Sequence, residues 1–282
     1  MFPNINLPEV TLRALLQDVL SRASDLPHDN SFTLTTNSSI CGLVFRPAVE
    51  ALRGCAYACV DDEAQTIRVQ TSGSSINEAI ANIARTLNDA GCVPRWRDEL
   101  LDLWADDGKS VGAIERGVVR PLGALTRAVH LNAWSADGGL WVARRSLTKP
   151  TDPGMWDTLV GGLISLGEPV ELALERESFE EAGLSAADLA ARTPIRTVAL
   201  MRRRLPEGYQ REQVLTSECV IPNALTPVNQ DGESMAIECL SPQAVLKKLE
   251  DGEFTVEASL VILEDLIFRV TGKREPLASW PT

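Results

Sequence analysis

The stretch GGLISLGEPVELALERESFEEAGL, residues 161–184, combines a glycine turn, a helix and six glutamates. Glu168 and Pro169 favour the start of a helix, because an acidic side chain suits the positive N-terminal end and proline is tolerated in the first turn. Gly183 favours its end. The sequence therefore predicts a helix over residues 169–182.

The predicted helix has an acidic face. Glu177, Glu180 and Glu181 fall within one arc of about 100°. The residues expected to pack on the opposite side are Leu172, Phe179 and Ala182. Like charges at this spacing repel one another, and only part of that repulsion is offset by Arg176. Hard divalent cations such as Mg²⁺ take carboxylate oxygens and suit the remainder, and the alternative is a solvated acidic surface.

The spacing of the whole stretch extends this pattern. After Gly162 come five residues and Glu168, then seven residues and Arg176-Glu177, and finally Glu180-Glu181 and Gly183-Leu184. This arrangement resembles the signature of the Nudix hydrolase family. Ser178 departs from it, since the family usually has an aliphatic residue there, and this affects the expected packing rather than the metal chemistry.

The resemblance implies a divalent-metal site, with Mg²⁺ or Mn²⁺ as the cofactor. The implied ligands are the main-chain carbonyl of Gly161 and the side chains of Glu177, Glu180 and Glu181, with Arg176 as the group that orients the carboxylates. Metal ions held in this way would bridge diphosphate oxygens and lower the pKa of an attacking water. The family often uses a further carboxylate outside the helix, and Glu233 is the candidate, with an exposed turn residue as the alternative.

Basic and aromatic residues just before this stretch are candidates for substrate binding. Arg144, Arg145 and Lys149 carry the guanidinium and ammonium groups that suit a diphosphate, and solvation of a strand end is the alternative. Trp156 and Trp96 are candidates for stacking on a heteroaromatic ring, although a buried tryptophan is the commoner case.

The chain of 282 residues is long enough for two domains. Residues 1–120 are expected to form a smaller α+β domain, which contains a helix opened by a capping box at Ser75 and Glu78. Residues 121–282 alternate predicted strands and helices. They are expected to form an α/β domain, a Nudix-type α/β/α sandwich with a mixed sheet.

A net charge of −12 and a pI near 4.8 argue against general affinity for nucleic acid or for anionic membranes. The sequence has no apolar run close to the ~20 residues of a membrane span and no signal-peptide pattern, so a cytoplasmic protein is expected. The expected partner is a small-molecule diphosphate substrate, and a homodimer is left open.

Further stretches narrow the resemblance. The run WVARRSLTKPTDPGMWDTLVGGLISLGE at residues 141–168, with VHLNAW, WRDEL and IERG upstream, is similar to a plant and fungal Nudix subgroup. That subgroup includes the Nudix part of some thiamine pyrophosphokinases. The similarity implies hydrolysis of thiamine diphosphate, or of a damaged or oxidised analogue, to the monophosphate.

Two other functions compete with a diphosphate hydrolase. The isopentenyl-diphosphate isomerases resemble the fold expected for this chain. That family uses a cysteine in an early strand, where this chain reads HLNAW. A non-catalytic Nudix sensor that binds a metabolite would tolerate loss of the metal-binding carboxylates. Because Glu177, Glu180 and Glu181 are all present, the hydrolase is the leading hypothesis.

Overall fold

The computed structural model describes residues 5–37, 39–71, 73–149, 151–274 and 277. Its N-terminal half contains a sheet with the strand order β2-β1-β4-β3. The strands are β1 (Phe32–Thr36), β2 (Ser39–Val44), β3 (Ala58–Asp61) and β4 (Thr66–Val69). They share one apolar core with α2 (Arg46–Leu52), α3 (Ile76–Asp89) and the hairpin of β5 (Leu100–Trp104) and β6 (Ser110–Glu115), which leads into the short helix η1 (Arg116–Val118). This region is α+β, and Ser75 and Glu78 form the predicted capping box.

The C-terminal half is built on a seven-stranded sheet with the order β11-β12-β7-β8-β13, in which β10 pairs with β7 and β9 with β8. The strands are β7 (Leu125–Ser135), β8 (Leu140–Arg145), β9 (Trp156–Thr158), β10 (Val160–Leu163), β11 (Arg196–Leu205), β12 (Gly208–Ile221) and β13 (Ser234–Leu240). Strands β7 and β12 are parallel, and their other neighbours are antiparallel. The predicted mixed sheet is confirmed.

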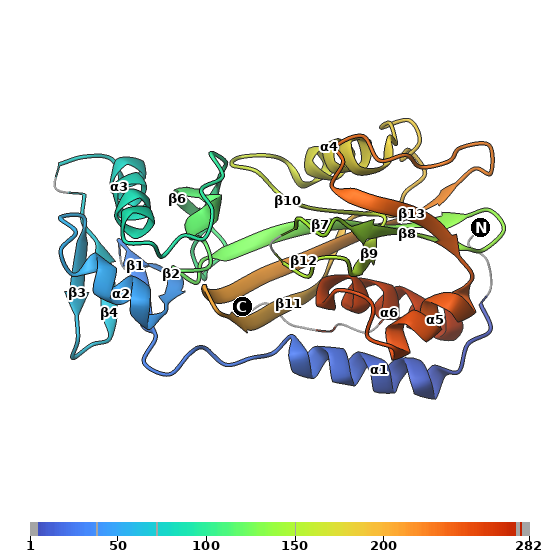
Figure 1. Ribbon diagram of the computed structural model, residues 1–282, viewed down its shortest axis with the longest axis horizontal. Coiled ribbons are helices and arrows are strands. Elements are labelled where there is room, and N and C mark those ends of the chain that lie inside the picture. The colour runs from blue at the N-terminus through green and yellow to red at the C-terminus, as the bar shows by residue number, and fades with distance from the viewer. Residues whose placement is uncertain (1–4, 38, 72, 150, 275–276, 278–282) are drawn as a thin grey trace.

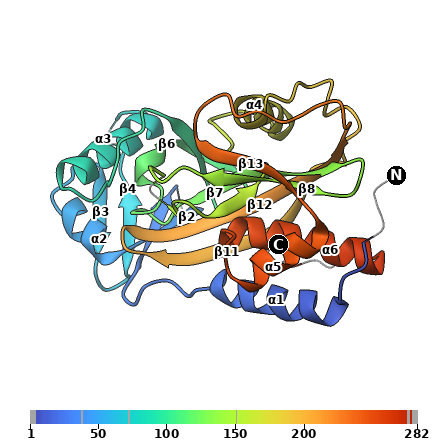
Figure 2. The same ribbon diagram turned by 45° about the vertical axis from the view of Figure 1, so that its right-hand side comes forward.

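Helices cover both faces of this sheet (Figures 1 and 2). Helix α4 (Val170–Ala182) shares an apolar core with one face. The other face carries α5 (Pro242–Glu250), α6 (Val256–Thr271) and, from the start of the chain, α1 (Glu9–Arg22). The arrangement is the expected α/β/α sandwich. Within the described part of the chain, we find no helix with the length and apolar character needed to cross a membrane.

Helix α1 does not pack with the N-terminal sheet that follows it. Its buried residues Leu12, Leu16 and Val19 lie in the same apolar core as α6. Figure 1 shows α1 alongside α6, joined to the N-terminal sheet by an extended segment. Helix α6 is buried on nearly all sides, so it needs this cover. The expectation that residues 1–120 form a self-contained unit therefore has to be corrected for α1, while a boundary near residue 120 stays a prediction.

The predicted limits of helix α4 are confirmed, but its expected packing face is wrong in part. Leu172 and Phe179 are more than half exposed. The buried residues of the helix are Ala173, Leu174, Ser178, Glu181 and Ala182. Small side chains let α4 lie close to β10 and β7, and this turns Glu181 toward the interior.

Candidate active site

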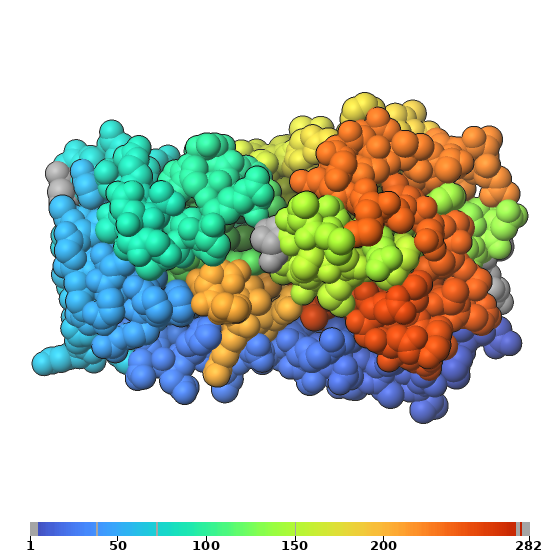
Figure 3. All heavy atoms as spheres, viewed as in Figure 1, coloured from blue at the N-terminus to red at the C-terminus, as the bar shows by residue number. Residues whose placement is uncertain are grey.

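A cavity of about 640 Å³ lies between the two halves of the molecule. Its walls come from the segments around Arg97 and Arg116, from β7 and β12, from α4 and from the loop that carries Glu233. Figure 3 shows the surface hollowed between the teal atoms of the N-terminal half and the lime atoms that follow β8. This volume is in the range of small-molecule sites.

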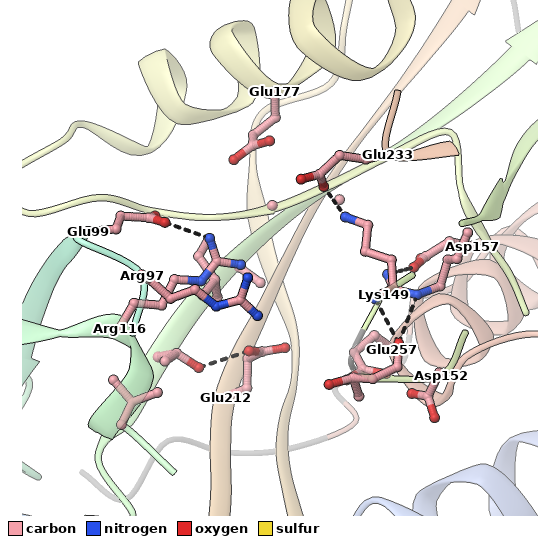
Figure 4. Close-up of a pocket in the computed structure, with 18 of the residues that line it drawn as sticks. Arg97, Glu99, Arg116, Lys149, Asp152, Asp157, Glu177, Glu212, Glu233 and Glu257 are labelled. Carbon is pink, nitrogen blue, oxygen red and sulfur yellow. Dashed lines mark hydrogen bonds and ion pairs between the residues drawn. The ribbon is translucent and has the colours of Figure 1, made fainter. Parts of the chain in front are cut away.

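Three glutamates of α4, Glu177, Glu180 and Glu181, line the cavity, and two of them lie against the glycine turn. Glu181 is 9% exposed, and its Oε2 accepts a hydrogen bond of 2.7 Å from the N–H of Gly161. Glu177 points into the cavity (Figure 4) and lies against Gly162, where an added Cβ would come within 2.0 Å of its carboxyl carbon. Burial, followed by the charge of Glu177, raises the pKa of Glu181 to about 8. The site therefore holds more negative charge than its protein neighbours balance.

Arg176 joins three carboxylates of this stretch, as the sequence predicts. Its guanidinium donates to Glu168 at 2.8 Å, to Glu177 at 2.7 Å and to Glu180 at 3.2 Å. It also donates to the carbonyl of Leu163. These contacts raise the pKa of Arg176, the bond to Glu168 contributing most. Glu168, which was expected from the sequence only at the start of the helix, accepts two hydrogen bonds from Arg176 and holds it beside the turn.

A second group of carboxylates faces Glu181 from the loop before β13. Ligand oxygens of Glu181, Asp231 and Glu233 all lie within 4.8 Å of one another. Three converging carboxylates are a donor set that suits a hard divalent cation. Glu233, expected from the sequence, is brought to the site, whereas Asp231 was missed. The recorded contact of Gly161 is through its N–H, so the metal-binding role of its carbonyl stays a prediction.

Lys149 and Arg145 supply positive charge next to this group. Lys149 Nζ forms an ion pair with Glu233 (Figure 4). Arg145 donates to Asp157 at 2.8 Å and to the carbonyl of Thr151. Burial lowers the pKa of Lys149, and the charge of Glu181 opposes that effect. Both predicted basic residues thus line the cavity beside the carboxylates.

Residues 124–259 match the family model described as NUDIX domain. They form a NUDIX domain. The chain is 30% identical over 197 residues to Nudix hydrolase 20, chloroplastic, of Arabidopsis thaliana, a match that covers 68% of this chain and 52% of that protein. It is 29% identical to a Nudix hydrolase of Deinococcus radiodurans, over 55% of this chain and 86% of the other.

The chain spans about half the length of the two Arabidopsis relatives it matches. Among solved structures, the crystal structure of DR0079 from Deinococcus radiodurans has 25% sequence identity and a TM-score of 0.45, and the match covers 60% of this chain and 99% of that one.

Arg144 and Trp156 were expected to bind substrate, but neither residue lines the cavity between the two halves. Successive residues on a strand point to opposite faces, so Arg144 turns away from the side that Arg145 occupies. Arg144 donates to the carbonyl of Gly154 and lies 5.8 Å from the centre of the Trp156 ring. Trp156 is 5% exposed, packs in the core shared with α6, and also has Lys248 over its ring. No substrate ring can stack on it without opening that core.

Trp96 is also outside the cavity. Its indole N–H donates to Asp98 at 2.7 Å, and its ring packs against the core of the N-terminal half. The neighbouring residue Arg97 points into the cavity instead (Figure 4). The WRDEL stretch therefore presents a guanidinium to the cavity and not an indole.

The N-terminal half contributes a basic wall that sequence reasoning did not identify. Arg95, Arg97, Arg116 and Arg120 all line the cavity. Arg116 is paired with Glu99 at 2.7 Å, whereas no partner is recorded for the Arg97 guanidinium among the described residues. Burial, and then the positive charges of Arg116 and Arg95, lower the pKa of Arg97. The many charged residues of WRDEL and IERG were the only sequence feature that pointed to these arginines. Their position beside the Nudix domain follows from the fold.

The far side of the cavity carries acidic residues that were also missed. Glu212 comes from β12 and Glu257 from α6, and Asp152 and Asp157 lie nearby (Figure 4). These positions are spread from residue 152 to residue 257 of the chain, so no local pattern joins them. The cavity thus has a basic wall from the N-terminal half, the glutamates of α4, and a second acidic wall.

Proposed function

We propose that the chain is a divalent-metal-dependent hydrolase that cleaves the diphosphate linkage of a small molecule, releasing the monophosphate and inorganic phosphate. The observation that carries this proposal is the convergence of Glu177, Glu181 and Glu233 on one wall of a cavity that also contains Lys149 and Arg97. Carboxylates for metal ions and cations for phosphate oxygens are the two parts that diphosphate cleavage needs.

The buried carboxylates fit a divalent cation. Glu177, Glu180 and Glu181 from α4 would hold it, with Asp231 and Glu233 within reach of Glu181. Burial, and then the charge of Glu177, raise the pKa of Glu181, and a bound cation would favour its ionised form. A bound divalent ion supplies charge neutralisation on the diphosphate and acidifies a coordinated water.

The protein's own residues bind and orient the substrate. Arg145 and Lys149 offer guanidinium and ammonium donors to phosphate oxygens on one side of the cavity. Arg97 offers a second guanidinium from the N-terminal half. Arg176 fixes the carboxylates of α4 relative to the glycine turn, so their oxygens do not have to be ordered during the reaction.

For the substrate we propose thiamine diphosphate or an oxidised analogue. The support is the resemblance of the cavity-forming stretches to the thiamine-type Nudix subgroup, together with the coexistence of basic and acidic walls. The tryptophan wall expected from the sequence is missing from the cavity lining. Recognition of the ring must therefore rest on other side chains.

Phosphate release tests the proposal directly. Thiamine diphosphate, ADP, ADP-ribose, NADH and isopentenyl diphosphate would each be incubated with the full chain and Mg²⁺ or Mn²⁺, with a coupled phosphatase for substrates that yield only monophosphates. We expect metal-dependent turnover with the highest kcat/KM for thiamine diphosphate. Higher kcat/KM for ADP-ribose or NADH would refute the substrate. No turnover of any diphosphate would favour the sensor, and isomerised isopentenyl diphosphate without phosphate release would favour the isomerase.

A further inference from the structure

Glu212 is a buried carboxylate that points into the cavity from β12 (Figure 4). It is 7% exposed. Its Oε2 accepts a hydrogen bond of 2.8 Å from the hydroxyl of Thr126 on β7, which fixes the direction of the side chain. Among the described residues, no hydrogen bond to Oε1 and no ion pair with a cation are recorded.

The neighbours of Glu212 leave further acceptors unused. Gln210, on the same side of β12, is 6% exposed and donates to Glu257 Oε1 at 3.2 Å. Its own Oε1 and the Oε2 of Glu257 have no hydrogen-bond partner among the described residues. Burial, then the charge of Glu212, raises the pKa of Glu257 to about 7. Two acceptor oxygens beside Glu212 therefore lack a donor among the described residues.

Two arginines on the strands around Glu212 pair with other carboxylates. Arg211, next in the strand, points to the other face and pairs with Asp106 at 2.6 Å. Arg203 pairs with Asp152 at 3.4 Å and lies 3.7 Å from Glu257. A buried carboxylate without a counter-charge is costly, so a cationic ligand would be held strongly there.

A metal ion is a poor occupant for this corner. In the described part of the chain, the one group of three or more acidic, histidine or cysteine side chains whose ligand atoms all lie within 4.8 Å of one another is Glu181, Asp231 and Glu233, and Glu212 is not part of it. Glu212 offers a single free oxygen, which suits a larger organic cation. The basic wall around Arg97 would take the anionic end of the same molecule.

We propose that Glu212, oriented by Thr126, binds a positively charged group in the non-phosphate part of the substrate. This inference rests on the proposed function, because it assigns the diphosphate to the other side of the same cavity. It names the substrate class as a diphosphate ester of an organic cation. Glu212 is then a specificity-determining residue outside the metal-binding carboxylates.

The test compares two ligands that differ in one charge. Thiamine has a cationic thiazolium ring, and its thiophene isostere replaces the quaternary nitrogen with carbon. Neither carries a phosphate, so calorimetric binding to the full chain depends neither on metal nor on turnover. We expect wild type to bind thiamine at least ~10-fold more tightly than the isostere, and Glu212→Gln to reduce this preference to less than ~2-fold.

Two further variants keep the test decisive. Glu238→Gln removes an exposed carboxylate of β13 outside the cavity and should retain the preference. Thr126→Val should weaken thiamine binding without changing charge, and it replaces Glu212→Gln if that variant does not fold. Equal binding of both ligands by wild type, no binding of either, or a preference that survives Glu212→Gln would overturn the inference. Failure of phosphate release with an intact preference would instead count against the proposed hydrolysis.

Discussion

At the scale of single residues, Glu181 shows how the fold prepares a charge for a ligand. It is buried, held by the N–H of Gly161, and placed beside Glu177, so its ionised form is disfavoured in the free protein. A bound divalent cation would favour the ionised form of Glu181 instead. The folded chain therefore accepts a stability cost at this position, which is common for catalytic groups.

We expect Glu181→Gln to lower kcat by at least ~10²-fold, because it removes charge aimed at the reacting phosphate and its metal. The melting temperature without metal should be unchanged or higher, since the substitution removes a buried titratable group whose ionised form the fold disfavours. Glu175→Gln, on the same helix but outside the cavity lining, is the matched control. Turnover of Glu181→Gln within a few-fold of wild type would refute the catalytic role.

Glu257 should make stability depend on pH. Its pKa is raised from 4.5 to about 7, so between these values the folded protein keeps a proton that the unfolded chain has released. Its contribution to the free energy of unfolding is complete below pH 4.5 and falls as the pH rises toward 7. Glu257→Gln should lessen the drop in melting temperature between pH 5 and pH 8, whereas the exposed Glu250→Gln should not. An unchanged drop in Glu257→Gln would contradict this.

At the scale of elements, helix α4 was the best predicted part of the molecule. Its caps are local signals, since Pro169 and the left-handed Gly183 act within a few residues. Its packing face was harder to predict, because the apolar Leu172 and Phe179 are exposed, and Ser178 is buried with no hydrogen-bond partner for its hydroxyl in the described part of the chain. In the observed rotation of the helix, Glu181 lies against the glycine turn. Hydrophobicity alone predicts a rotation that buries Leu172 and Phe179 instead.

Arg176 links α4 to the segment before it, so its removal should affect both stability and activity. With Arg176→Ala, the carboxylates of Glu168, Glu177 and Glu180 lose their common partner and repel one another. We expect a melting temperature lower by several degrees and a kcat lower by ~10-fold or more. Arg176→Lys should restore part of the stability, since it returns one charge but not the forked contacts. A higher melting temperature in Arg176→Ala with unchanged turnover would show that Arg176 supports neither stability nor catalysis.

At the scale of the whole molecule, the cavity is a product of both halves. The glutamates, Arg145 and Lys149 come from the Nudix domain and could be predicted from its local pattern. Arg97, Glu212 and Glu257 could not, because their proximity depends on how distant elements pack. The packing of α1 on α6 could not be predicted from the local sequence either. A chain that begins near Leu122 would expose the α6 core, so such a truncation confounds folding with substrate binding.

A point substitution tests the N-terminal half more cleanly. Arg97 has a guanidinium that faces the cavity, and the positive charges of Arg116 and Arg95 beside it favour a bound anion. We expect Arg97→Ala to raise KM for the diphosphate substrate by ~10-fold and to change kcat by less than ~3-fold, because it removes substrate binding away from the metal-binding carboxylates. Steady-state kinetics at saturating Mg²⁺ would measure both constants.

The matched control for Arg97→Ala is Arg85→Ala, which removes an exposed arginine of α3 outside the cavity lining. It changes the net charge by the same amount, so it separates local contact from long-range attraction of the anion. Arg97→Lys should recover part of the affinity, since it keeps the charge but not the two-pronged geometry. If both alanine variants raise KM equally, or neither does, the N-terminal half does not bind the diphosphate through Arg97.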